Sequence, residues 1–281
     1  MEASSRYRDK RFGSEARNLG ETRFRLEYVG ETGSTNADLV KRANQGASEG
    51  LVLIAGHQTT GRGRLNRRWT APPGTNLLFS VLLRPDWPAN RLRLATSALA
   101  VSLVDALHLH LEGTGVSASV KWPNDVLLVG SDQPSCNDGK LAGVLAELIE
   151  VDPPVVVVGM GVNVNWPVAG DEAPPGATSL ASAGLNLAPM VLVGEILEGF
   201  ESWCTLLGQE CGARDLREAH LRRSATVGQQ VSVELASGPV NGMAADLGLD
   251  GGLVLDVSGA KFEVRSGDVI HLRTTSEDDP A

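Results

Sequence analysis

The sequence has few aromatic residues, few cysteines and a deficit of positive charge. Phe, Trp and Tyr together make up only 4% of the 281 residues, whereas Gly occurs 32 times. This mix favours a sheet-rich α/β enzyme over a helical bundle. The 25 Lys and Arg are outnumbered by 34 Asp and Glu, for a formal net charge of -9, which argues against a general binder of nucleic acids or anionic membranes.

Segments that direct a chain out of the cytoplasm are also missing. The first residues, MEASSRYRDKRFGSEARNLGE, are charged throughout and contain no apolar signal-peptide segment. No apolar run approaches the roughly 20 residues that a membrane helix needs. The three cysteines, Cys136, Cys204 and Cys211, are odd in number and form no CxxC pair. We therefore expect reduced thiols in a cytoplasmic protein that does not enter a membrane.

The length allows either one large domain or one large and one small domain. Residues 1–23 are polar and without periodicity, which predicts a disordered arm. Apolar runs and amphipathic stretches then alternate over 24–225, which indicates an α/β domain. The expected helices lie over 37–46, 91–111, 192–208 and 213–224. The expected strands lie over 51–58, 76–85, both sides of the WPND turn, 140–151 (where a helix is the alternative) and 153–165.

The texture of the sequence changes near residue 225. Over 226–273, short alternating runs are separated by Gly, Asp and Asn every 8 to 12 residues. This spacing is typical of a small β-barrel or sandwich, and about 50 residues suffice for an SH3-like barrel. Residues 274–281 read as an acidic tail.

The segment GRGRLNRRW, residues 61–69, concentrates four arginines in this acidic chain. A solvated basic loop and a nucleic-acid contact are two interpretations, although the latter requires a broader basic surface with stacking aromatics. The third is an anion clamp, because arginine pairs with phosphate through two hydrogen bonds and glycine lets the backbone approach a ligand. The segment follows an expected strand, where α/β sheets bind ligands.

Two lysine motifs follow. In KWPND, Lys121 could supply a fixed charge to a carboxylate or phosphate, and Asp125 could hold Mg²⁺ or orient a base. The structural alternative is a hairpin turn with Trp122 buried. In GKLAGVL, Lys140 is either another anion contact or an exposed lysine at the start of a strand.

Two further motifs are compatible with a ligand site. In GMGVNVN, Gly159 and Gly161 would let a ligand or a second backbone pack closely, or would mark strand bulges. In GSTNADL, residues 33–39, three small polar side chains at a helix start could hydrogen-bond a neutral polar ligand or serve as ordinary caps.

The order of these motifs is informative. GSTN, QxxGRGRxxRxW, KWPND, GKLAG and GxGxN occur in this order in a chain that resembles the biotin–protein ligase family from about residue 26 to the C-terminus. The resemblance implies a class II synthetase-like α/β (α+β) catalytic domain over 24–225, with a mixed sheet and flanking helices, and a C-terminal SH3-like β-barrel over 226–273. The resemblance is to the short, monofunctional members of the family, which lack an N-terminal helix-turn-helix domain.

The resemblance also implies roles for particular residues. Lys121 matches the lysine that bridges the biotin carboxylate and the α-phosphate, and Lys121, Arg64 and Asp125 form the implied catalytic set. No metal ligand is assigned. Asn66 stands where many members have Gly, and residues 129–138 form a long insertion. The implied biotin-binding residues are Ser34, Thr35, Asn36, Gln58, Arg62, Gly63, Arg64 and Lys121, and the implied ATP-binding residues are Arg67, Trp69, Asn124, Lys140 and Asn163.

The implied activity is an ATP- and Mg²⁺-dependent ligation. Biotin is activated as biotinyl-5'-AMP and transferred to a lysine on the biotin carboxyl carrier domain of an acyl-CoA or pyruvate carboxylase. We expect the protein to be a monomer or weak homodimer and to bind neither DNA nor membranes. Two alternatives stay open: a lipoate–protein ligase, and a non-catalytic biotin-responsive regulator.

Overall fold

The structure is a computed structural model that describes residues 22–130, 139–235 and 238–271. The predicted arm, apart from residues 22 and 23, lies outside the described residues, as do the predicted acidic tail, Cys136 and most of the 129–138 insertion. The two described cysteines, Cys204 and Cys211, are both free, and burial raises the pKa of the Cys204 thiol to about 12.

A seven-stranded mixed sheet forms the larger domain, which confirms the predicted fold class. The pair β1–β2 is parallel and all the other pairs are antiparallel, in the order β1-β2-β3-β7-β6-β5-β4. Residues 139–151 form a strand and not the alternative helix. The strands are β1 (Arg25–Val29), β2 (Leu51–Ala55), β3 (Leu77–Leu83), β4 (Val116–Lys121), β5 (Asp125–Gly130), β6 (Gly139–Val151) and β7 (Pro154–Val162).

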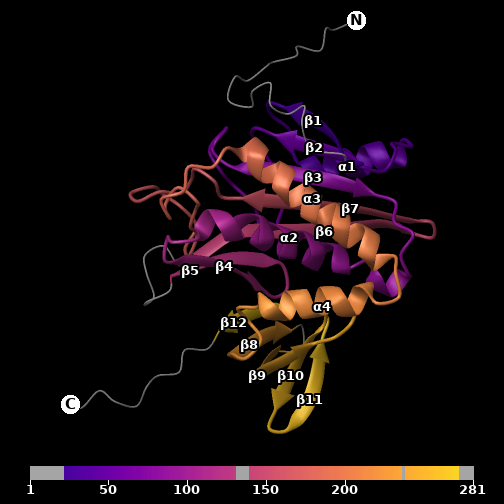
Figure 1. Ribbon diagram of the computed structural model, residues 1–281, viewed down its shortest axis with the longest axis vertical. Coiled ribbons are helices and arrows are strands. Elements are labelled where there is room, and N and C mark those ends of the chain that lie inside the picture. The colour runs from indigo at the N-terminus through magenta and orange to yellow at the C-terminus, as the bar shows by residue number, and fades with distance from the viewer. Residues whose placement is uncertain (1–21, 131–138, 236–237, 272–281) are drawn as a thin grey trace, which may run out of the picture.

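Helices cover both faces of this sheet. Helices α2 (Leu94–Leu111) and α3 (Pro189–Leu207) lie across one face (Figure 1) and share a large apolar core with it. Helix α1 (Thr35–Asn44) packs on the other face through Leu39 and Ala43. Helix α2 has the length and apolar composition of a membrane-spanning helix, but most of it is buried in the protein, as expected for a core helix.

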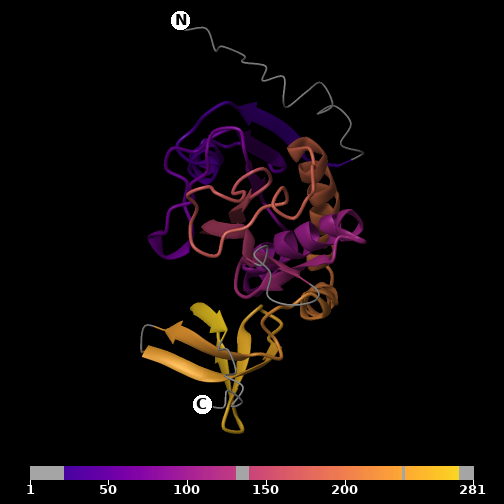
Figure 2. The same ribbon diagram turned by 90° about the vertical axis from the view of Figure 1, so that its left-hand side faces the viewer.

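The smaller domain is a five-stranded antiparallel sheet with its own core, which fits an SH3-like domain. Helix α4 (Gly212–Arg222) leads into it, and Figures 1 and 2 show the sheet below the larger domain. Its order is β11-β10-β9-β8-β12. The strands are β8 (Gln230–Leu235), β9 (Gly238–Leu247), β10 (Leu253–Val257), β11 (Ala260–Val264) and β12 (Asp268–His271).

The WPND turn joins the two domains. Trp122 belongs to the core of the smaller domain, and its indole N–H donates to the Gly251 carbonyl at 2.9 Å. On β4, Val120 donates to the Arg223 carbonyl and accepts from the Ala225 N–H at 2.7 and 2.9 Å. The predicted domain boundary near residue 225 thus coincides with a segment paired to the edge of the large sheet.

Candidate active site

A cavity of about 470 Å³ lies on the sheet face that also carries α1. This volume is in the range of small-molecule sites. Alternation along β7 explains the location: Val155 and Val157 pack beneath α1, whereas Gly159 and Gly161 face the cavity. The segment after β2, the WPND turn, β6 and Asp268 of the smaller domain complete the walls.

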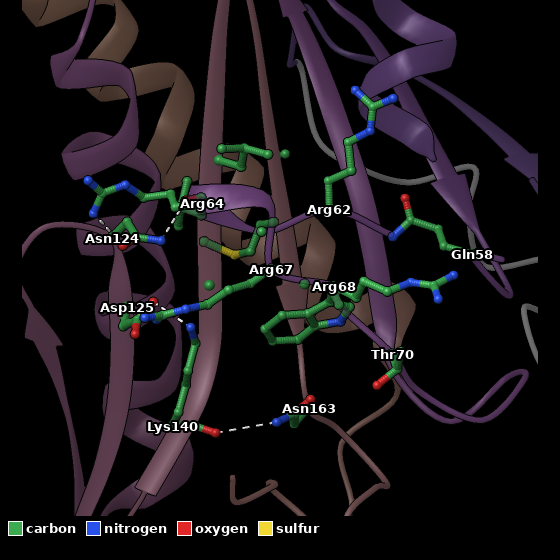
Figure 3. Close-up of a pocket in the computed structure, with 18 of the residues that line it drawn as sticks. Gln58, Arg62, Arg64, Arg67, Arg68, Thr70, Asn124, Asp125, Lys140 and Asn163 are labelled. Carbon is green, nitrogen blue, oxygen red and sulfur yellow. Dashed lines mark hydrogen bonds and ion pairs between the residues drawn. The ribbon is translucent and has the colours of Figure 1, made fainter. Parts of the chain in front are cut away.

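The arginine segment forms a short hairpin over this cavity. Arg62 and Arg68 pair as an antiparallel bridge, and the Gly63 N–H donates to the Arg67 carbonyl at 2.8 Å. A 3₁₀ turn (Arg64–Asn66) makes the tip, where Leu65 has a φ of 53° and is 68% exposed. The four arginines diverge: Figure 3 shows Arg62 and Arg68 extending away from Lys140, and Arg67 extending toward the side that holds Lys140.

Uncharged hydrogen-bonding groups line one end of the cavity. The Gln58 amide oxygen accepts from the Thr35 N–H at 2.7 Å and from the Thr35 hydroxyl at 3.1 Å. The Ser80 hydroxyl on β3 lies within hydrogen-bonding distance of Thr35 Oγ1 and Asn36 Oδ1, at 2.7 and 2.6 Å, and donates its one proton to one of the two. Both amide protons of Asn36 are used, by the Leu145 carbonyl and the Glu147 carboxylate. The Gln58 amide nitrogen has no hydrogen-bond partner within the described residues and can therefore donate to a ligand.

Glycines on β6 and β7 make a flat floor under Trp69. Gly143 and Gly161 are paired across the two strands. A Cβ at Gly161 would lie 2.5 Å from the indole Cε2, and one at Gly143 would lie 3.2 Å from Cζ3. At Gly159 a Cβ would lie 2.0 Å from the Asn36 amide oxygen. Gly143, Gly159 and Gly161 therefore make room for the side chains of Trp69 and Asn36. Gly159 and Gly161 pair with β3 and β6 without a register shift, so they do not mark bulges.

Charged groups gather at the opposite end (Figure 3). Lys140 Nζ lies 2.7 Å from Asp125 Oδ1 and 5.8 Å from the centre of the Trp69 ring. Arg64 donates to Asn124 Oδ1 at 3.2 Å, and burial lowers the pKa of this guanidinium, an effect opposed by Asp268 and Asp125. The cavity therefore offers the uncharged groups of Thr35 and Gln58 at one end, with Arg62 and Arg68 on the same side, and the cations Lys140, Arg64 and Arg67 beside two carboxylates at the other. This arrangement suits a molecule with a polar head and an anionic tail.

Lys121 is not placed as the sequence predicted. It pairs with Asp125 across the hairpin, but it is not among the described residues that line the cavity. Its charge lies near His271, whose pKa is lowered by burial first and by Lys121 second. Lys140, predicted only as a less certain ATP contact, is the lysine that reaches the cavity, because it lies on β6 next to β7.

The other predicted residues line the cavity, but not all are free to bind a ligand. Asn163 is 4% exposed; its amide protons go to the carbonyls of Lys140 and Thr178, and its oxygen accepts from Asn76. It therefore positions the Lys140 strand. Sequence reasoning missed Ser80 and Asp268: neither lies in a motif, and each reaches the site only through the fold. The predicted residues that line the cavity are Ser34, Thr35, Asn36, Gln58, Arg62, Gly63, Arg64, Arg67, Trp69, Asn124, Asp125, Lys140 and Asn163.

This fold and this cavity define a two-domain α/β protein with a small-molecule site of the kind used by ligases that activate a carboxylate. Residues 30–165 match the Biotin/lipoate A/B protein ligase family. Biotin–[acetyl-CoA-carboxylase] ligase of Mycobacterium tuberculosis is 39% identical over 256 residues, covering 88% of this chain and 89% of the relative. The chain therefore belongs to the biotin/lipoate protein ligase family.

Two more comparisons cover most of the chain. The enzyme of the same name from Paracoccus denitrificans is 32% identical, over 81% of this chain and 92% of the relative. Among solved structures, biotin protein ligase from Aquifex aeolicus in complex with biotin and ATP superposes with a TM-score of 0.70 at 27% identity, covering 89% of this chain and 99% of that one.

Proposed function

We propose that the protein is a biotin–protein ligase that forms biotinyl-5'-AMP from biotin and ATP and transfers the biotinyl group to a lysine of a carboxylase carrier domain. The observation that carries this proposal is the layout of the cavity, with the hydrogen-bonding pair Thr35 and Gln58 at one end and Lys140, Arg64 and Arg67 at the other. The similar proteins named above carry the same activity in their names, and one is bound to biotin and ATP.

The first step of the proposed reaction forms biotinyl-5'-AMP. A carboxylate oxygen of biotin attacks the α-phosphorus of ATP, the bond to the β-phosphate oxygen breaks, and pyrophosphate leaves. Because two anions must approach each other, the step needs fixed positive charge. Lys140, Arg64 and Arg67 supply this charge. The Trp69 indole, which packs on the glycines of β6 and β7, keeps water from the acyl phosphate. We therefore propose that Lys140, and not Lys121, bridges the biotin carboxylate and the α-phosphate.

Magnesium fits the cavity as a partner of the nucleotide. No cluster of three or more His, Cys, Asp or Glu suited to a metal ion occurs within the described residues. Mg²⁺ with a nucleotide typically needs only one or two protein carboxylates, since phosphates and water supply the rest. Asp125 and Asp268 both line the cavity and would hold it there, where it would neutralise phosphate charge.

The second step needs an uncharged amine. A lysine with a pKa of about 10.4 is almost entirely protonated at pH 7. Asp125 is the proposed base, because its carboxylate lies in the cavity beside Lys140. The amine nitrogen then attacks the acyl carbonyl, an amide forms and AMP leaves. We place this activity in the cytoplasm, with a biotin carboxyl carrier domain of an acyl-CoA or pyruvate carboxylase as acceptor.

A single assay separates the alternatives. The full chain is incubated with ATP, Mg²⁺ and either biotin or lipoate, and pyrophosphate release and labelling of a carrier domain are measured. We expect both signals with biotin only, because the Gln58–Thr35 end offers hydrogen bonds that suit a cyclic urea and that a dithiolane ring would leave unmade. Signals with lipoate only would identify a lipoate ligase, and biotin binding without pyrophosphate release would identify a regulator.

A further inference from the structure

A second cavity, of about 170 Å³, lies where the two domains meet. We call it the junction cavity. It shares Arg64, Asn124, Val144 and Leu145 with the larger cavity, so that Arg64 is part of a common wall. At 170 Å³ it is well below the roughly 300 Å³ at which drug-sized ligands begin to fit. It can therefore take a small ion but not a nucleotide. Its other lining residues are Arg93, Leu94, Thr96, Ser97, Trp122, Pro123, Ala146, His220, Asp250, Gly251 and Arg265.

The first turn of the 18-residue helix α2 faces this cavity. The N-cap residue Arg93 provides no side-chain cap. The first N–H groups are weakly paired, from Ala95 to the Leu92 carbonyl and from Thr96 to the Arg93 carbonyl, both at 3.3 Å. Because these bonds are long and no side chain caps the turn, the positive end of the helix dipole favours an anion here.

A buried histidine supplies an independent observation. His220 of α4 is 3% exposed and lines the junction cavity. Its Nδ1 lies 2.6 Å from the Ser97 hydroxyl, whereas its buried Nε2 has no hydrogen-bond partner among the described residues. Burial, and to a lesser degree Arg223, lowers the pKa of this imidazole to about 4, so it is neutral at pH 7. When Ser97 donates to Nδ1, Nε2 carries the proton and becomes a donor without an acceptor.

The charges around the cavity are unbalanced. Of the lining residues three are arginines and one, Asp250, is a carboxylate. Arg265 pairs with Asp250 at 2.7 Å and also with Glu263 at 3.4 Å, outside the cavity, whereas Arg93 is 4.0 Å from Asp250. Arg64 donates only to neutral oxygens, those of Asn124 and Gly267, in the part of the chain that the structure describes.

We propose that the junction cavity binds a phosphate-type oxyanion, held by the α2 N-terminus, His220 Nε2, Arg93 and Arg265. Two sources share this chemistry: pyrophosphate released by the proposed reaction, and free inorganic phosphate. The pyrophosphate source rests on the proposed function. The anion would also attract Arg64 across the common wall, and so would link occupancy of the junction cavity to the arginine hairpin.

Calorimetric titration tests the site directly, with the full chain and without biotin or ATP. Pyrophosphate and inorganic phosphate are the probes. We expect the double variant R93Q/R265Q to weaken binding at least tenfold, and D250N to strengthen it because a repelling carboxylate is lost. Both arginines are more than half exposed, so the double variant should fold. The matched control, R25Q/R214Q, removes two exposed arginines that line neither cavity and should bind as the wild type does.

The outcomes are distinct from those of the ligase assay. Binding that survives R93Q/R265Q but is lost in Lys140→Ala would place the anion in the larger cavity and overturn the proposal, as would no binding at all. Arginine-dependent binding by a chain that fails to biotinylate would refute the proposed function and retain the anion site. At least tenfold tighter binding of pyrophosphate than of phosphate identifies the product as the ligand, and equal binding identifies free phosphate. Loss of binding in His220→Leu, with an unchanged circular dichroism spectrum, would support the proposed contact of the imidazole, and unchanged binding would overturn that contact.

Discussion

The guanidinium of Arg67 lies against the carboxylate of Asp268, 201 residues further along the chain. The neighbouring Gly267 carbonyl accepts from Arg64 at 3.3 Å. Both arginines belong to the hairpin over the larger cavity, and both acceptors belong to the smaller domain. The smaller domain therefore holds the hairpin over the site, and the arginine segment contacts both domains although Arg62, Arg67 and Arg68 are exposed to solvent.

Replacing Asp268 by Asn should loosen this hairpin. Arg67 is 69% exposed, so the pair is worth no more than exposed pairs generally are, about 0.2–1 kcal/mol. We expect biotinyl-5'-AMP to leave the protein about twofold to fivefold faster. Trypsin cleavage between Arg62 and Arg68 should be accelerated similarly. In the wild type, biotin plus ATP should slow this cleavage, since bound ligand favours the closed state.

The control for this variant is Asp246→Asn. Asp246 pairs with Arg217 at 2.5 Å and also lies in the smaller domain, but it does not line the larger cavity. It should leave adenylate release and trypsin cleavage unchanged. If both variants release the adenylate faster than the wild type and at equal rates, a general weakening of the smaller domain explains the result, and Asp268 has no specific role.

Lys140 and Lys121 form a matched pair for the chemistry of the first step. Lys140→Ala should lower pyrophosphate release by about 10²–10³, the usual cost of removing one preorganised group that stabilises developing charge. Lys121→Ala should stay within about twofold of the wild type, since Lys121 is outside the cavity lining. Circular dichroism checks that both variants fold. A large loss in Lys121→Ala with near-normal Lys140→Ala would restore the role that sequence order predicted.

Gly161→Ala should displace the Trp69 indole. The added methyl group would lie 2.5 Å from Cε2, and overpacking of this kind costs about 1–3 kcal/mol. We expect biotin affinity to fall about tenfold or more and tryptophan fluorescence to change. Gly30→Ala is the control, because a Cβ there meets no atom within 4 Å. Unaltered biotin affinity in Gly161→Ala would show that the indole is not part of the biotin site.

His220 should make stability depend on pH. Its folded pKa of about 4 lies below the unfolded value of about 6.5, so the unfolded state binds more protons between these values. The free energy of unfolding should therefore fall as the pH drops from 7 to 4, by roughly 3 kcal/mol from this group. Urea denaturation measures it. His220→Gln should show a shallower pH dependence, and identical pH profiles for the two proteins would contradict the assignment.

Local sequence patterns predicted much of the fold. Continuous apolar runs predicted β2 and β3, which are buried on both faces, and Ser34 caps α1 as a Ser or Asn was expected to. Strand β1 was missed. Its five residues, RLEYV, are exposed or half-buried at the edge of the sheet, and Leu26 and Tyr28 alternate with Arg25 and Glu27 over only four positions. An edge strand held by one parallel neighbour leaves little trace in its own composition.

The sequence by itself determined the motifs, their order and the family. It also placed glycines at Gly143 and Gly161, which only the pairing of β6 with β7 turns into a floor for Trp69. Which lysine serves the site was decided by tertiary structure: strand order puts Lys140 beside the cavity and Lys121 at the domain junction. The packing of the smaller domain against the larger one likewise places Asp268 at the site. Side chains distant in sequence meet only where strand order and domain packing bring their backbones together, and neither is encoded in a local pattern.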